Sequence, residues 1–155
     1  MTVQTIQIFD QKEKTRIARV VLEALPEWFA VEEAREDYIR KSADWAFFAA
    51  FEGERAVGFL CVKQTGEATA ELAVMGVLQE FHRRGVGRGL FAAAKAFAVN
   101  QGYEFMQVKT VRMGMYESYD RTNLFYKSLG FKEFEVFPTL WGEADPCQIY
   151  VMALR

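Results

Sequence analysis

A strand, an amphipathic helix and a second strand follow one another between residues 69 and 110. Residues 69–77 form an apolar run of strand length, and residues 103–110 form another. Between them, Gly102 ends a helix whose apolar side chains recur at helical spacing, at Val86, Leu90, Ala93, Ala94 and Phe97. A connection of this length predicts a right-handed parallel crossover, so the fold must contain a parallel pair of strands.

The other periodic segments complete a mixed α/β chain. Strand-like runs lie at residues 3–9, 45–51, 56–62, 131–137 and 148–154. Helical spacing predicts helices at residues 17–25, 31–41 and 118–129, with Pro26 and Gly130 ending the first and the last. A short turn containing Gly53 predicts a hairpin of the second and third strands, which are apolar on both faces. The predicted order is β-α-α-β-β-β-α-β-α-β-β, an α/β (α+β) fold with a central mixed sheet flanked by helices.

Composition limits the classes of protein that this chain can belong to. Its 155 residues, 51% of them hydrophobic, predict a single domain spanning residues 1–155 with a sizeable core. The formal net charge of −2 leaves no excess of positive charge for a nucleic-acid backbone. We therefore expect a folded domain without a nucleic-acid partner.

The cysteines and the apolar runs give no sign of a secreted, zinc-binding or membrane protein. Cys61 and Cys147 lie far apart and neither belongs to a CxxC motif, so we expect no disulfide framework and no metal. The longest apolar runs have only strand length, and residues 1–9 lack the pattern of a signal peptide. We therefore expect a cytoplasmic protein with no membrane partner.

The sequence HRRGVGRG at residues 82–89 stands at the start of the helix that follows the 69–77 strand. A helix start offers unpaired backbone N–H groups, glycines let an anion approach them, and arginines add charged donors. The segment lacks the Gly-Lys-Ser/Thr of a P-loop and the third glycine of a dinucleotide-binding fingerprint. It predicts an anion-binding loop of another kind, although a glycine-rich turn with solvated arginines remains an alternative.

Two motifs in this chain resemble those of the GNAT superfamily of N-acetyltransferases. The spacing His82-x-x-Gly85-x-Gly87 is similar to the family's Gln/Arg-x-x-Gly-x-Gly/Ala loop, with His82 as the departure. Residues 123–131, NLFYKSLGF, are similar to a later block in which an aromatic-Tyr pair precedes Leu-Gly-Phe. The resemblance covers nearly the whole chain and implies a GNAT-like acyl-CoA N-acyltransferase fold.

The resemblance implies acetyl-coenzyme A as co-substrate. Backbone amides of the loop would hold its pyrophosphate, and the backbone around Val77 would pair with the pantetheine arm and polarise the thioester. The implied cofactor-binding residues are Val77, His82, Arg83, Arg84, Gly85, Val86, Gly87, Arg88 and Phe125. For His82, the only histidine, we expect a structural or phosphate-side role rather than a catalytic one. Tyr119 stands where the family commonly has an asparagine, so that cofactor contact is not expected here.

Two catalytic residues are expected. A tyrosine hydroxyl keeps its proton at neutral pH, and the resemblance implies that Tyr126 protonates the leaving thiolate, with a purely packing role as the alternative. Glu71 opens an otherwise apolar run, where desolvation makes a carboxylate a better proton acceptor. The resemblance places a general base at this position in some relatives, whereas ordered water is the alternative.

The resemblance implies a primary amine as acceptor, carried by a small molecule or a peptide. The resemblance implies that loops line its site, and the aromatic candidates there are Trp28, Phe29, Tyr116 and Trp141, each of which could instead be packing. The exposed edge of a closing strand could also pair with a second copy, which leaves a homodimer open.

The predicted function is N-acetyltransfer from acetyl-coenzyme A by direct attack in a ternary complex, without a covalent enzyme intermediate. Two alternatives keep the same binding loop: a non-catalytic acyl-coenzyme A sensor, and an N-acyltransferase that uses a longer acyl group. A flavin or nucleotide binder that uses the same loop is a third.

Overall fold

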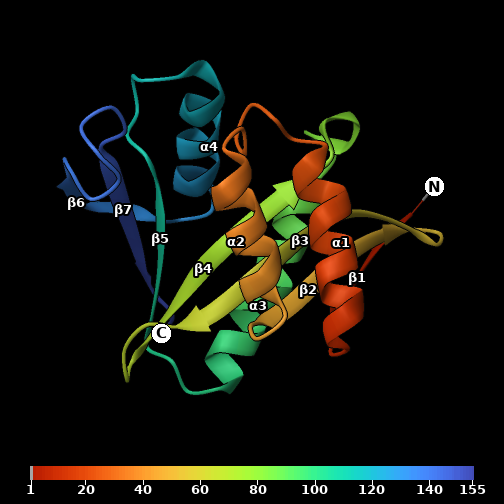
Figure 1. Ribbon diagram of the computed structural model, residues 1–155. Coiled ribbons are helices and arrows are strands. Elements are labelled where there is room, and N and C mark those ends of the chain that lie inside the picture. Colours follow the sequence, from red (N-terminus) through yellow and green to blue (C-terminus); the bar gives the residue numbers. More distant parts are fainter. Residues whose placement is uncertain (1) are drawn as a thin grey trace. The chain divides into compact units, whose positions relative to one another are not determined.

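The computed structural model describes residues 2–155 and confirms the predicted order of helices and strands (Figure 1). The strands are β1 (Val3–Ile8), β2 (Ala46–Glu52), β3 (Arg55–Gln64), β4 (Thr69–Val77), β5 (Phe105–Val111), β6 (Lys132–Phe137) and β7 (Cys147–Ala153). The helices are α1 (Gln11–Glu23), α2 (Glu32–Ser42), α3 (Val86–Asn100) and α4 (Glu117–Ser128). A single 3-10 turn, Gln79–Phe81, which the sequence analysis did not predict, precedes α3.

The strands form a mixed sheet in the order β1-β2-β3-β4-β5-β7-β6. β4 and β5 pair in parallel, with Thr69 opposite Phe105 and Leu72 opposite Val108, which confirms the predicted crossover. β2 and β3 form the predicted antiparallel hairpin. The pairs β1–β2, β5–β7 and β6–β7 are antiparallel as well.

The chain divides into two compact units. Unit 1 is the chain through Lys63 together with Ala73–Phe97, and unit 2 is Gln64–Leu72 together with Ala98–Arg155. The division falls within β4, whose first residues pair with β5 in unit 2 and whose last residues belong to unit 1. The expectation of one domain over residues 1–155 stays a prediction.

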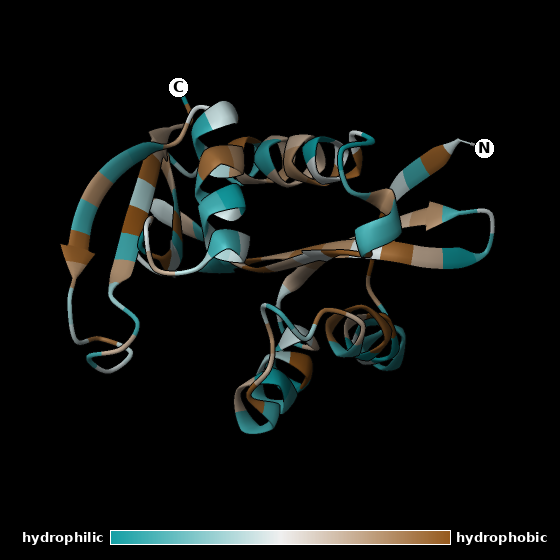
Figure 2. Cartoon of the chain, turned by 90° about the horizontal axis from the view of Figure 1, so that it is seen from above, coloured by the Kyte–Doolittle hydropathy of each residue, from teal (hydrophilic) through white to brown (hydrophobic). Residues whose placement is uncertain are grey.

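In unit 1, α1 packs directly on the end of β4. A Cβ atom at Gly76 would lie 2.9 Å from Cγ1 of Val21 and 3.1 Å from Cδ1 of Leu25, so the helix approaches a strand position that has room only for glycine. The β2–β3 hairpin is buried along most of its length, with the rings of Phe47 and Phe59 stacked at 5.1 Å. Figure 2 shows these two strands as hydrophobic stretches joined by a hydrophilic turn.

In unit 2, α4 covers one face of the β5–β7–β6 strands. Tyr126 and Asn123 of α4 both contact Tyr150 of β7. β6 is the edge strand, and its pairing with β7 is interrupted by a bulge between Glu133 and Glu135. None of the helices in the described part of the chain combines the length and the apolarity that a membrane span requires.

Candidate functional site

The loop between β4 and α3 turns sharply before the helix begins. Arg83 has φ +63° and Gly85 has φ +79°, so both residues adopt the left-handed conformation, which is uncommon for arginine. The first hydrogen bond of α3 runs from the N–H of Gly89 to the carbonyl of Gly85, at 3.0 Å. The N–H groups just before Gly89 belong to the first turn of a helix, where no earlier helical carbonyl is available, and they suit an anion.

Charged side chains surround this loop within unit 1. Arg83, Arg84 and Arg88 are all exposed. The Arg84 guanidinium lies over the Phe81 ring, with Cζ 4.8 Å from the ring centre, and Arg84 also donates a hydrogen bond to the Glu80 carbonyl. The loop therefore presents positive charge at the positive end of the α3 dipole.

His82 connects the same loop to the end of β4. Its Nε2 lies 2.6 Å from the carbonyl oxygen of Val77. A carbonyl oxygen can only accept, so Nε2 carries the proton in this contact. The imidazole also meets the Trp28 ring edge to face at 5.8 Å, while Gln79 donates to the Glu27 carboxylate at 3.2 Å. His82 thus ties the end of β4 to the loop between α1 and α2.

The two acceptor candidates of unit 1 differ in their surroundings. Trp28 lies against His82 of the β4–α3 loop, as described. Phe29 packs edge to face on Tyr38 of α2, with ring centres 6.1 Å apart. Both side chains are half-buried.

In unit 2, Glu71 is paired with a lysine that the sequence analysis missed. Nζ of Lys109 lies 2.7 Å from Oε1 of Glu71, which is only 5% exposed. Glu71 is opposite Gln107 across the β4–β5 pair, and Lys109 lies two residues further along the same face of β5. The alternation of apolar and polar residues along β5 could have placed Gln107 and Lys109 on one face, but it gives no sign of their partners. The candidate proton acceptor therefore has an ammonium beside it.

Cys147 lies at the start of β7, opposite Val111 on β5, and is fully buried. Burial raises the pKa of its thiol, the Lys109 ammonium lowers it, and the Glu71 carboxylate raises it. The thiol is therefore held in its protonated form beside the Glu71–Lys109 pair.

Tyr126 lies in an aromatic cluster and is 7% exposed. Its ring contacts Phe125, Phe131 and Tyr150, with ring centres 5.9 to 6.2 Å apart. These contacts fix the ring of the candidate acid, as well as the neighbouring ring of the cofactor-binding candidate Phe125.

Asn123, one helical turn before Tyr126, connects three elements. Its side-chain nitrogen donates to the carbonyl oxygens of Val111 (2.9 Å) and Tyr119 (2.7 Å), and its oxygen accepts from the Tyr150 hydroxyl (2.6 Å). Burial raises the pKa of Tyr150 to about 12, with a further contribution from Glu133. Asn123 was not among the predicted site residues, although an asparagine among apolar residues on a helix is a signal of a buried polar contact.

Two loops of unit 2 are tied together beside exposed aromatic side chains. The Tyr116 hydroxyl donates to the Asp145 carboxylate at 2.9 Å, and this bond raises the pKa of Tyr116. The N–H of Arg112 donates to the carbonyl of Pro146 at 2.9 Å. Tyr116 and Trp141, the acceptor candidates of unit 2, are exposed and belong to these two loops.

Metal-ligating side chains do not cluster in the described residues. Between residues 2 and 155, no group of three or more His, Cys, Asp or Glu side chains could hold a metal ion.

Comparisons with known proteins agree with the fold. The family described as "Acetyltransferase (GNAT) domain" matches residues 43–133. An uncharacterised N-acetyltransferase of Chlorobaculum tepidum is 28% identical over 138 residues, covering 84% of this chain and 79% of that protein.

Solved structures give the same picture of the fold. A GNAT-family acetyltransferase of Desulfovibrio desulfuricans superposes with a TM-score of 0.85 at 21% identity, covering 99% of this chain and 100% of that one. The PaiA N-acetyltransferase of Thermoplasma acidophilum, solved in complex with coenzyme A, superposes with a TM-score of 0.73 at 18% identity, covering 96% and 98%. The mixed sheet flanked by helices is therefore the GNAT acetyltransferase fold.

Proposed function

This chain belongs to the GNAT acetyltransferase family, and from that premise we propose that it transfers an acetyl group from acetyl-coenzyme A to a primary amine. The attack is direct, in a ternary complex, without a metal and without a covalent enzyme intermediate. The observation that carries the proposal is the loop between β4 and α3, which lies inside the matched span of residues 43–133.

The loop fits the pyrophosphate of this co-substrate. Arg83 and Gly85 adopt the left-handed conformation, and α3 begins at Val86 immediately afterwards. Backbone amides from Arg83 to Arg88 bind the phosphates, and the arginine side chains add charge. His82 holds the loop through the Val77 carbonyl instead of reaching for the phosphates itself. That coenzyme A is bound to a structural neighbour supports the same assignment.

The acyl transfer requires one proton acceptor and one proton donor. The amine nitrogen attacks the thioester carbonyl carbon, a C–N bond forms and the C–S bond breaks. Glu71, directly or through ordered water, takes the proton that the amine loses. Tyr126 gives its hydroxyl proton to the leaving thiolate, and a backbone N–H near Val77 polarises the carbonyl.

Lys109 positions the Glu71 carboxylate, since its Nζ lies 2.7 Å from Oε1. Phe125 contributes to coenzyme A binding beside Tyr126. The acceptor amine comes from a small molecule or a peptide, and the aromatic candidates for binding it are Trp28 and Phe29 of unit 1 and Tyr116 and Trp141 of unit 2. We also propose that the protein acts in the cytoplasm.

Calorimetric titration with acetyl-coenzyme A tests the proposal, with coenzyme A, ATP and NAD as controls. We expect saturable binding in the micromolar range, about 8 kcal/mol, that is selective for the coenzyme A forms. Absence of binding by the folded protein would remove this function. Binding without turnover, over a broad panel of amines and of acetyl, propionyl and succinyl donors, would favour a sensor. Turnover only with a longer donor would favour an N-acyltransferase that uses a longer acyl group.

A further inference from the structure

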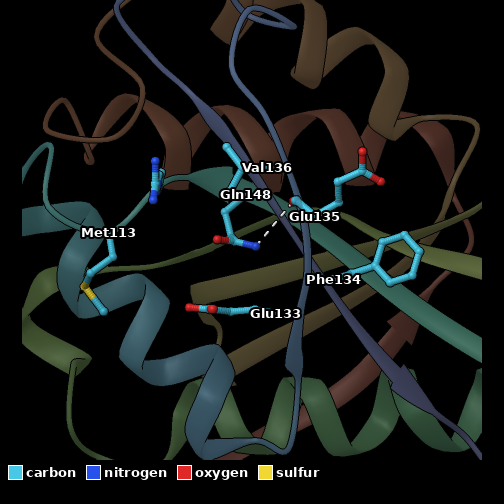
Figure 3. A pocket seen from close by; sticks show the side chains of 7 residues that line it. Met113, Glu133, Phe134, Glu135, Val136 and Gln148 are labelled. Atoms are coloured by element: carbon cyan, nitrogen blue, oxygen red, sulfur yellow. Dashed lines mark hydrogen bonds between the residues drawn. The ribbon is translucent and has the colours of Figure 1, made fainter.

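An open cavity of about 480 Å³ lies within unit 2, and its lining includes none of the residues proposed for acetyl transfer (Figure 3). Its lining comes from Arg112 and Met113, which follow β5, from residues 133–136 of β6, and from Gln148 of β7. Glu133 is opposite Tyr150 and Val136 is opposite Gln148 in the β6–β7 pair. Since Tyr150 and Gln148 are two residues apart, these side chains share the face that carries α4.

Gln148 provides the cavity with a hydrogen-bond acceptor. It is 5% exposed, and its Nε2 donates to the carbonyl oxygens of Glu135 (3.3 Å) and Ile149 (3.1 Å). Carbonyl oxygens only accept, so the amide nitrogen must face them and the amide oxygen must face the other way. Figure 3 shows that oxygen turned away from Glu135, on the side of Met113. Among residues 2–155 no donor reaches this oxygen, and it does not count among the buried polar atoms without a partner, so it is open to the cavity.

The cavity wall carries both signs of charge. The Arg112 guanidinium has no carboxylate partner among the described residues, and Arg112 lines the cavity. The Glu133 carboxylate lies 3.1 Å from Lys127 of α4, and both of these side chains are about half-exposed. Figure 3 shows Glu133 extending to the same side of β6 as the Gln148 oxygen. Arg112 would repel a purely cationic ligand, and Glu133 would repel a purely anionic one.

We propose that this cavity binds a free α-amino acid with an apolar side chain, in its zwitterionic form. Arg112 pairs with the carboxylate of the amino acid, while Glu133 and Oε1 of Gln148 accept hydrogen bonds from its ammonium. Met113 and Val136 contact its side chain. The ligand thereby supplies a donor to the amide oxygen of Gln148 and a carboxylate to the exposed guanidinium of Arg112.

Titration of the full chain with L-leucine, in the absence of any acyl donor, tests this site. Isoamylamine lacks only the carboxylate of leucine, and 4-methylpentanoate lacks only the ammonium. We expect saturable binding of leucine and binding at least about tenfold weaker for each truncated compound. No saturable leucine binding up to about 10 mM, or equal binding of one truncated compound, overturns the proposal.

Variants locate the binding. Arg112→Met and Glu133→Gln should each weaken leucine binding by at least about tenfold. Their matched controls are Arg121→Met and Glu117→Gln, which remove the exposed ion pair of α4 and should leave binding unchanged. Leucine binding that survives in both test variants, or that falls equally in the controls, contradicts the site. Because acetyl-coenzyme A is absent from these titrations, their outcome is independent of the proposed acetyl transfer.

Discussion

The Tyr150 hydroxyl on β7 donates a 2.6 Å hydrogen bond to Oδ1 of Asn123 on α4, and Asn123 is completely buried. The Asn123 nitrogen continues the connection to the Val111 carbonyl at the end of β5. One side chain therefore fixes α4 on two strands of unit 2. Since Tyr126 follows Asn123 by one helical turn, the same bridge sets the position of the candidate catalytic acid.

Tyr150→Phe should destabilise the protein, because it leaves the buried oxygen of Asn123 without its donor. We expect the free energy of unfolding in urea to fall by about 1–3 kcal/mol, the cost of an unsatisfied buried acceptor. Tyr103→Phe, at a half-buried position outside this bridge, is the control and should change it by less than about 0.5 kcal/mol. Equal effects of the two variants would show that the bridge adds no stability.

The same hydroxyl should make stability depend on pH in the alkaline range. The pKa of Tyr150 is raised to about 12 in the folded chain, from a reference value near 10. A raised pKa contributes stability that is fully present below pH 10 and is lost as the pH rises through 12. Between these two values, the unfolding free energy of the wild type should fall more steeply than that of Tyr150→Phe. Parallel curves for the two proteins would refute the assignment.

Gly76→Ala should destabilise unit 1 through a steric clash. The added methyl group would lie 2.9 Å from Cγ1 of Val21, so α1 has to move away from β4. Overpacking of this kind costs about 1–3 kcal/mol, measurable by chemical unfolding. Gly66→Ala is the matched control, since its nearest contact would be an ordinary 3.9 Å. A Gly76→Ala variant as stable as Gly66→Ala would mean that α1 adjusts at no cost.

Lys109→Met should destabilise unit 2, because it removes the ammonium that lies 2.7 Å from the buried Glu71 carboxylate. Loss of one partner of a buried pair costs about 3–5 kcal/mol, and the partial exposure of Lys109 lowers our expectation to about 1–3 kcal/mol. The double variant Lys109→Met, Glu71→Gln should recover much of this loss, because no charge is then left without its partner. Strict additivity in this cycle would show that the two groups do not interact.

The sequence predicted the helices and strands well because their apolar spacing is local. The 69–77 strand was predicted to the residue. The first helix begins at Gln11, before the predicted residue 17, because its first turn is polar and is set by the Asp10 cap, whose carboxylate accepts from the N–H of Glu13. The strand predicted from residue 103 begins at Phe105, because the N–H of Tyr103 caps α3 on the Ala98 carbonyl.

The sequence predicted the candidate site only where the signal is contiguous. The loop of residues 82–88 can be recognised from its adjacent glycines and arginines. The helix α3 begins at Val86, the first apolar position of the predicted helix. The Glu71–Lys109 pair joins residues 38 positions apart, and the Asn123–Tyr150 bond joins residues 27 positions apart. Such pairs depend on the register between strands and on the docking of a helix, which no local pattern specifies. The contact of His82 with Val77 is local in sequence. The family motif could not predict it, because the family has glutamine or arginine where this chain has His82.

Tyr126→Phe distinguishes an enzyme from a sensor, and it tests the proposed acid directly. The ring is held by Phe131 and Tyr150, so removal of the hydroxyl should leave the fold and the binding of acetyl-coenzyme A unchanged. A proton donor of this kind contributes about 10²–10⁴-fold to the rate, so kcat should fall by about 10²-fold or more while the dissociation constant of acetyl-coenzyme A stays within about twofold. Tyr103→Phe again serves as the control and should retain full turnover. If kcat of Tyr126→Phe equals that of the control, the tyrosine only packs, and another group or water protonates the thiolate. If the dissociation constant rises in step with the loss of turnover, the hydroxyl acts in binding, and the proton donor must be sought elsewhere.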